Sequence, residues 1–111
     1  MSGKFELSKS KNEKFMFNLK AGNGEVVLTS QMYESKPSAL QGIESVRNNA
    51  PIDARYERKA SSKGEPFFNL KATNGQVIGH SEMCSSTSAM EGGITSVKKN
   101  APDAKLVDLA V

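Results

Sequence analysis

The sequence predicts an α+β fold in which two β-β-β-α repeats form one mainly antiparallel sheet, with two helices on one face and a closing C-terminal strand. Three observations predict it. The chain matches itself at a period of 51 residues, each repeat has strand-like segments joined at Asn-Gly, and each ends in an amphipathic helical segment followed by Asn-Ala-Pro. At 111 residues the chain has the length of one domain. We therefore expect one domain, 1–111, whose repeats (about 3–53 and 54–108) share one core.

The repeat aligns with itself without a gap. Residues 17–21, Phe-Asn-Leu-Lys-Ala, fall on residues 68–72, and about half of the positions between 17 and 51 are identical to their partners. Self-similarity at a fixed period is typical of repeated supersecondary units. Because there are only two copies, we expect a closed pair rather than a solenoid.

Each repeat opens with three predicted strands. They cover residues 4–8, 14–21 and 25–30 in the first repeat and 55–59, 65–72 and 76–81 in the second. Asn23-Gly24 and Asn74-Gly75 separate the second strand from the third. Asn-Gly favours a two-residue type I′ turn, because both central positions of that turn need positive φ.

A two-residue turn fixes the hairpin register. It places Phe17, Leu19 and Ala21 opposite Ser30, Leu28 and Val26 on the buried face, with Phe68, Leu70 and Ala72 opposite Ser81, Gly79 and Val77 in the second repeat. Lys20 then pairs with Val27, and Lys71 with Ile78. The open face is expected to carry Met16, Asn18, Lys20, Val27 and Thr29, and in the second repeat Phe67, Asn69, Lys71, Ile78 and His80.

A helix follows the strands in each repeat. Ser35 and Ser86 are the expected N-caps, an apolar stripe at helical spacing follows each, and Asn-Ala-Pro ends it. Gly42 and Gly93 lie on that stripe, which predicts close approach of helix and sheet. A last strand, 105–109, follows the second helix, and the symmetry of the repeat predicts that it reaches back to the first repeat.

These motifs resemble a known family. The pattern Phe-Asn-Leu-Lys-Ala-x-Asn-Gly-x-Val, then Ser-x-Met, then Gly-Ile-x-Ser-Val-x-x-Asn-Ala-Pro is similar to the YegP-like family, short bacterial proteins built from a domain of unknown function. The resemblance covers essentially the whole chain and implies two β-β-β-α units in one sheet with exchanged terminal strands. It implies no established activity. Cys84 departs from the pattern, since Tyr33, at the same place in the first repeat, is the type more typical of the family.

Composition bounds the location and the partners. The net charge is +3 and the basic residues are spread along the chain, whereas a dedicated nucleic-acid binder usually has a denser basic patch. Cys84 is the only cysteine, no apolar stretch could span a bilayer, and the N-terminal residues lack the apolar run of a signal peptide. We expect a cytoplasmic protein without a membrane partner.

Catalytic and cofactor chemistry has little support in the sequence. A zinc site needs about four ligands, and His80 and Cys84 are the only residues of their types, so we expect no metal site and no cofactor. His80 and Cys84 could be neighbours and form a nucleophile–base pair. The first repeat has Thr29 and Tyr33 at those places, so catalysis is the least favoured hypothesis and we expect no enzyme.

The open sheet face is the candidate binding surface. Its candidate residues are Asn18, Lys20, Phe67, Asn69, Lys71 and His80. The favoured hypothesis is a non-enzymatic interaction module that binds a protein partner, or a second copy of itself, through this face or through an edge strand. The second hypothesis is a weak binder of nucleic acid or of a small anionic ligand, since faces that mix aromatic, amide and Lys side chains can stack bases and contact phosphates.

Overall fold

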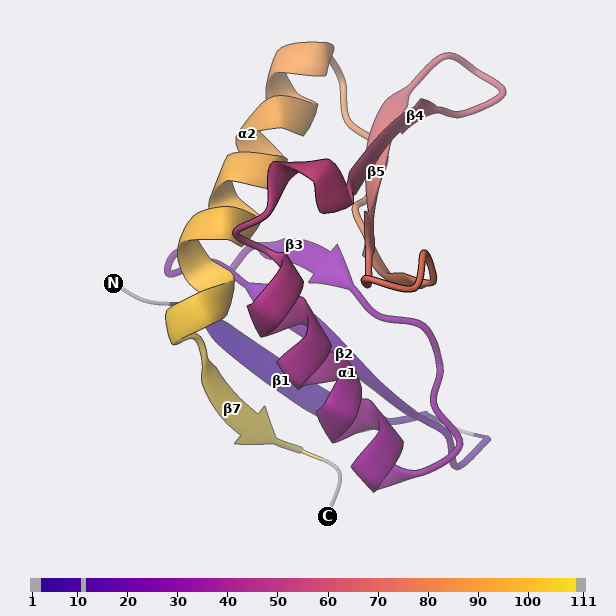
Figure 1. The fold of residues 1–111 in the computed structure, drawn as a ribbon, viewed down its shortest axis with the longest axis vertical. Coiled ribbons are helices and arrows are strands. Elements are labelled where there is room, and N and C mark those ends of the chain that lie inside the picture. The colour runs from indigo at the N-terminus through magenta and orange to yellow at the C-terminus, as the bar shows by residue number, and fades with distance from the viewer. Residues whose placement is uncertain (1–2, 11, 110–111) are drawn as a thin grey trace.

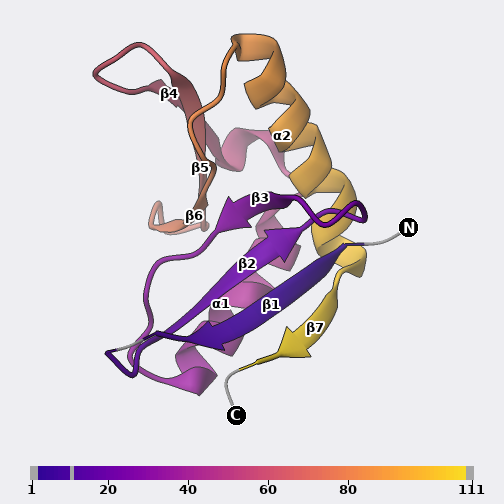
Figure 2. The ribbon, with the colours of Figure 1, turned by 180° about the vertical axis from the view of Figure 1, so that it is seen from behind.

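The computed structural model describes residues 3–10 and 12–109. Its elements are β1 (Lys4–Lys9), β2 (Phe15–Lys20), β3 (Val26–Thr29), α1 (Lys36–Asn49), β4 (Tyr56–Ala60), β5 (Pro66–Lys71), β6 (Val77–His80), α2 (Thr87–Asn100) and β7 (Lys105–Asp108), with short 3-10 turns at Asp53–Arg55 and Ala101–Asp103. The strands form one sheet in the order β4-β5-β6-β3-β2-β1-β7. Both helices cover one face of it (Figures 1 and 2), so the predicted α+β fold is confirmed.

The two repeats meet at the centre of the sheet. There β3 pairs with β6 in antiparallel fashion and Thr29 lies opposite His80, two positions that are 51 residues apart. The strand order on either side of this pair is mirrored, β2-β1 on one side and β5-β4 on the other. The sheet therefore has an approximate twofold axis through the Thr29–His80 pair.

The closing strand lies where the symmetry of the repeat predicts it. β7 pairs in parallel with β1, the first strand of the first repeat. The Lys105 N–H donates to the Gly3 carbonyl at 3.2 Å and the Leu109 N–H to the Leu7 carbonyl at 2.7 Å. All other neighbouring strands are antiparallel.

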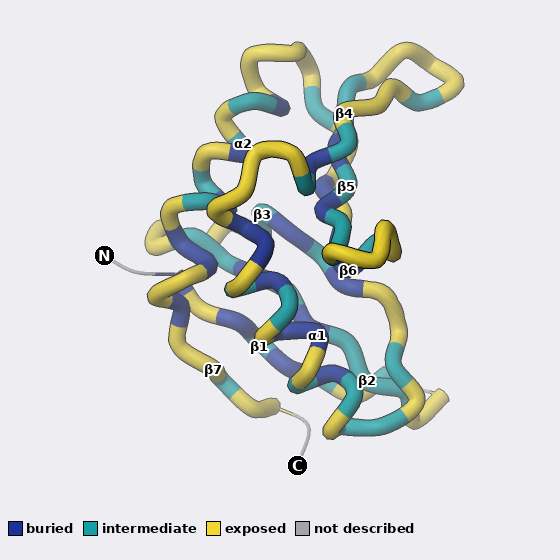
Figure 3. Tube along the Cα trace, viewed as in Figure 1, coloured by how far each residue is buried: buried dark blue, intermediate teal, exposed yellow. Residues whose placement is uncertain are grey.

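Each helix packs on strands of both repeats. α1 contacts β2 of its own repeat and β5 and β6 of the other, while α2 contacts β5 and β3. Figure 3 shows buried segments on the helices and on the strands of both repeats. One cluster of buried side chains contains, among others, Phe5, Phe17, Leu19 and Leu28 from the first repeat and Phe68, Leu70, Ile94 and Val97 from the second.

The hairpin turns differ from the predicted type. The Gly24 N–H donates to the Ala21 carbonyl and the Ala21 N–H to the Glu25 carbonyl, both at 2.9 Å. Gly24 has a φ of 88°, whereas Asn23 is not among the residues with positive φ. The turn is thus a longer loop with one left-handed glycine, and the type I′ prediction was wrong. The Asn23 side chain explains the difference, because its Oδ1 accepts the Glu25 N–H at 3.0 Å.

The longer turn shifts part of the register. Leu19 lies opposite Leu28 as predicted, but an irregularity follows and Lys20 pairs with Val26 instead of Val27. In the second repeat Lys71 pairs with Val77 instead of Ile78. The prediction that Val27 and Ile78 lie on the open face was therefore wrong: Val27 packs against the core and Ile78 is only 8% exposed. Ala21, Val26, Ala72 and Val77, expected on the buried face, are only half-buried.

Serine side chains hold the ends of the strands and helices. Ser30 Oγ accepts the Phe17 N–H at 2.8 Å and donates to the Gln31 carbonyl, and Ser81 repeats this contact with the Phe68 N–H at 3.0 Å. The predicted N-caps are confirmed, since Ser35 and Ser86 accept N–H groups three residues later. Both buried serines therefore satisfy backbone groups that the strand ladder leaves over.

Replacing Ser30 with Ala is expected to destabilise the fold by about 1–3 kcal/mol, because the buried Phe17 N–H loses its acceptor. Urea unfolding followed by circular dichroism measures the change. Ser88→Ala is the control, since Ser88 is exposed in the first turn of α2. Equal unfolding midpoints for the two variants would contradict this role of Ser30.

We propose that the two repeats fold as one cooperative unit, because each helix packs on strands of the other repeat. A fragment of residues 1–53 is then expected to give the NMR spectrum of an unfolded chain, or to pair with a second fragment so that Thr29 faces Thr29. Amide spectra and sedimentation at two concentrations test this. A folded monomeric fragment would show instead that each repeat is a domain of its own.

Candidate functional site

One continuous row of polar residues crosses the open face of the sheet. Register pairs connect its members from β4 to β1 in the order Glu57, Asn69, His80, Thr29, Asn18 and Glu6. Cross-strand partners share a face, so all six side chains lie on the face that the helices leave uncovered. This set is called the polar row. It brings together three of the predicted site residues, Asn18, Asn69 and His80, around the approximate twofold axis.

The two predicted lysines lie beside the polar row and are paired with its acidic ends. Lys20 Nζ is 2.9 Å from Glu6 Oε1, and Lys71 Nζ is 3.0 Å from Glu57 Oε2. Asn69 Nδ2 also donates to Glu57 Oε1 at 3.2 Å. The repeated lysines and acidic residues thus form two equivalent ion pairs on the open face.

These contacts favour the charged carboxylates. The hydrogen bond from Lys20 holds the pKa of Glu6 below its ordinary value, and Lys71 followed by Asn69 does the same for the pKa of Glu57. Glu6 and Glu57 were not among the predicted site residues. Their signal was in the repeat itself, since both precede a hairpin at equivalent positions of the first strand.

The segments after β3 and β6 continue alongside β2 and β5 and carry exposed methionines. Ser30 N–H bonds to the Phe17 carbonyl and the Tyr33 and Phe15 backbones exchange two hydrogen bonds. The segment after β3 therefore continues alongside β2, with Gln31 and Met32 both opposite the one residue between Phe15 and Phe17, which is Met16. Met32 is 54% exposed.

The second repeat has the same arrangement with a different partner. The Ser81 N–H bonds to the Phe68 carbonyl and the Cys84 N–H to the Pro66 carbonyl. Two residues, Glu82 and Met83, therefore lie opposite Phe67, and Met83 is 50% exposed. Phe67, a predicted site residue, is itself half-buried and pairs with Lys59 of β4.

His80 and Cys84 lie on different sides of the sheet. His80 belongs to the polar row, whereas Cys84 is half-buried and packs against the core, and it lines a cavity next to Gly93 of α2. The structure does not bring the two side chains together as a nucleophile and its base. In residues 3–10 and 12–109, His, Cys, Asp and Glu do not gather in groups of three or more that could hold a metal ion.

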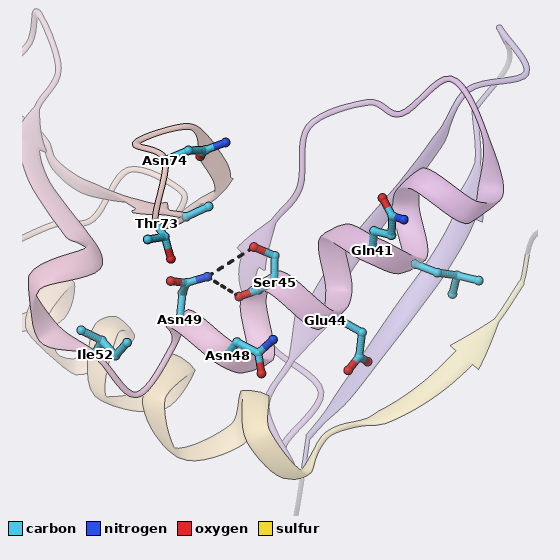
Figure 4. A pocket seen from close by; sticks show the side chains of 10 residues that line it. Gln41, Glu44, Ser45, Asn48, Asn49, Ile52, Thr73 and Asn74 are labelled. Carbon is cyan, nitrogen blue, oxygen red and sulfur yellow. Dashed lines mark hydrogen bonds between the residues drawn. The ribbon is translucent and has the colours of Figure 1, made fainter.

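A separate groove of about 700 Å³ lies between α1 and the β5–β6 turn (Figure 4). Asn49 in its wall donates to the Ser45 carbonyl at 2.8 Å and accepts from Arg55 Nε at 3.0 Å. Thr73 and Asn74 come from the turn of the other repeat. Asn100 makes the same contact with Ser96 in α2, so these asparagines hold the helix ends. Predicted site residues do not line this groove.

Comparisons with known proteins identify relatives over the whole length. A family model described as "Domain of unknown function (DUF1508)" matches residues 10–57 and 61–108, at the period of the repeat. A UPF0339 protein of Shewanella oneidensis is 54% identical over 109 residues, covering 98% of this chain and 99% of that protein. UPF0339 protein YegP of Escherichia coli K12 is 56% identical over 100 residues, covering 90% and 91%. The predicted tandem repeat and the YegP-like resemblance are confirmed.

Two solved structures share the fold. The solution NMR structure of a UPF0339 protein from Shewanella oneidensis has a TM-score of 0.94 and 54% identity, and covers 99% of this chain and 93% of that one. The solution NMR structure of E. coli yegP has a TM-score of 0.94 and 52% identity, and covers 99% and 95%. These names state no ligand, reaction or partner. A helix long and apolar enough to cross a membrane does not occur in the described part of the chain.

Lys71→Gln is expected to raise the pKa of Glu57 toward its ordinary value, because the ammonium that favours the carboxylate is lost. The folded-state pKa of Glu57 lies below the unfolded value, so the stability contributed by the pair is present above the unfolded pKa. It is lost as pH falls through the folded pKa. The variant should therefore lose less stability than the wild type as pH falls from about 5 to about 3.

Carboxyl-carbon NMR and urea unfolding across this pH range measure both effects. Lys99→Gln is the control, because Lys99 lies on α2, on the covered side of the sheet. An unchanged Glu57 titration in the Lys71 variant would mean that the ion pair does not persist in solution.

Proposed function

We propose that this chain, which belongs to the family of the domain of unknown function DUF1508, is a non-enzymatic interaction module that binds a protein through the open face of its sheet. One observation carries the proposal. Met32 and Met83, at equivalent positions of the two repeats, are 54% and 50% exposed in the segments that follow β3 and β6, and Met83 also lines the cavity beside α2. Unbranched, polarizable methionine side chains adapt to partner surfaces and are common at protein-binding sites. A single exposed apolar residue is ordinary on a protein surface, but here both repeats expose a methionine at the same position.

The β4 edge of the sheet supports the face over strand addition as the binding mode. β4 is short and carries Glu57, Arg58 and Lys59 in succession. Arg58 is held by Glu91 at 2.6 Å and by Asp53 at 3.1 Å. Short, charged strands are the usual protection of a sheet edge against pairing with another chain. Strand addition at β4 is therefore disfavoured, which supports the face as the surface for a partner.

Charge pairing supports a protein over a nucleic acid. Lys20 and Lys71, the lysines closest to the centre of the face, each contact a carboxylate instead of standing free for a phosphate. Phe67 is the aromatic residue that the face offers for base stacking. Binding of nucleic acid requires basic groups that release counterions from phosphates. We place the activity in the reducing cytoplasm, where a free Cys84 persists.

The double variant Met32→Glu with Met83→Glu is expected to weaken partner binding at least about tenfold, because two charges would replace apolar contact area. The immobilised chain first captures proteins from a lysate of its native cell. The partner is the protein that binds the wild type and the control variant Ile52→Glu but not the double variant. Ile52 is the matched control because it is 41% exposed and lies after α1, away from the open face.

Titration of the labelled chain with the purified partner then maps the contact. Shifts are expected at the amides of Asn18, Asn69 and His80. Equal loss of binding in the Ile52 variant would contradict the proposal. So would saturable shifts of the same three amides on addition of a single-stranded oligonucleotide, which would support the nucleic-acid hypothesis instead. Light scattering at two concentrations identifies a second copy of the chain as the partner.

A further inference from the structure

Both repeats have a glycine on the helix, Gly42 and Gly93. The residue beside that glycine differs between the repeats, Tyr33 in the first and Cys84 in the second. In the first repeat the Tyr33 ring stacks on the Phe17 ring, with centroids 6.1 Å apart and planes 13° apart. A Cβ added at Gly42 of α1 would collide with the Tyr33 hydroxyl and lie 3.1 Å from Phe17 Cε2. The Tyr33 ring therefore fills the space between Phe17 and the backbone of α1.

The second repeat has the same frame without the ring. Phe68 corresponds to Phe17, Gly93 to Gly42 and Cys84 to Tyr33. A Cβ added at Gly93 would meet only Phe68 within 4 Å, at 3.2 Å from Cε2. Gly42 is buried whereas Gly93 is half-buried. Cys84 thus puts a smaller side chain at the place that the Tyr33 ring fills in the first repeat, and Gly93 has more free space beside it than Gly42.

A second difference widens the same region. In the first repeat Gln31 Nε2 donates to the Val77 carbonyl at 2.8 Å and ties the segment after β3 to β6. The equivalent residue of the second repeat is Glu82, whose carboxylate cannot donate to the carbonyl of Val26, the counterpart of Val77. The segment after β6 therefore lacks that tie to β3.

A cavity of about 360 Å³ lies at this place, between α2, β3 and the segment after β6. Its lining includes Phe68, Cys84, Gly93, Val27 and Met83. Phe68 lines the cavity but exposes no surface to water, so a guest reaches the ring only when the side chains over it move aside. The Met83 side chain is half exposed and unbranched, and it can move aside for a guest.

We propose that this cavity binds a small molecule with a single planar aromatic ring, of the size of a phenol, stacked on Phe68 as Tyr33 stacks on Phe17. The volume lies within the range of small-molecule sites, and the ring pair of the first repeat shows which shape fits the frame. Offset stacking and burial of the ring supply the binding energy. Met83 is common to this cavity and to the proposed protein contact, whereas Cys84 and Gly93 belong to the cavity alone and separate the two proposals.

The test titrates p-cresol, the side chain of tyrosine, into the labelled chain. Saturable shifts are expected at the amides of Cys84, Gly92 and Gly93, with those of Tyr33 and Gly42 unchanged. Cys84→Tyr fills the cavity with the ring of the first repeat and should weaken binding at least about tenfold. Cys84→Ser keeps the cavity open and should bind within about twofold of the wild type.

The reciprocal variant creates the site in the other repeat. Tyr33→Cys should add a second set of shifts around Gly42, and p-cresol should raise its melting temperature more than that of the wild type. If this variant does not fold, the Cys84 pair decides the question alone.

Three results would overturn the proposal. The first is binding of p-cresol by Cys84→Tyr with wild-type affinity. The second is equal binding of cyclohexanol, whose ring is not planar, which would show that any apolar guest suffices. The third is binding of N-acetyl-tyrosinamide without binding of p-cresol, which would assign the cavity to a tyrosine of a partner chain.

Discussion

A single backbone bridge, Thr29 opposite His80, joins the two halves of the sheet, and the rest of the structure depends on how this narrow joint is supported. One bridged pair cannot hold a three-stranded half and a four-stranded half together against the entropy of the chain. The support comes from the helices, since α1 reaches β5 and β6, and α2 reaches β3. Burial of apolar side chains between the two repeats therefore stabilises this joint, as the hydrogen bonds between strands do elsewhere in the sheet.

The helix caps, the Leu19–Leu28 pairing and the place of the closing strand could be predicted, whereas the turn type and the pairing of the first strands could not. The caps at Ser35 and Ser86 and the pairing of Leu19 with Leu28 follow from patterns a few residues long. The prediction of the turn type was wrong because the Asn23 side chain accepts a hydrogen bond from the Glu25 N–H. The Asn-Gly pair alone does not specify that hydrogen bond. Glu6 and Glu57 were not predicted as site residues, because no turn signal fixes the register between the first strand and the second.

The two repeats are alike on the open face and differ at the cavity. On the face, Glu–Lys pairs recur on both sides of the axis, so what the repeat copied has stayed symmetric. Beneath α2, Cys84 and Glu82 stand at the positions where the first repeat has the Tyr33 ring and the hydrogen-bond donor Gln31. A surface shared by both halves suits a large contact across the axis, whereas a change in one half alone gives one small cavity.

The parallel pairing of β1 with β7 sets an order for folding. Lys4 lies beside Lys105, so this edge joins residues about a hundred positions apart in the chain. Contacts of such separation carry the largest loop-closure entropy and form late. β1 can pair with β2 through a short hairpin long before its other edge meets β7. During synthesis, the first strand of this protein therefore keeps one unpaired edge until residues 105–108 have been made.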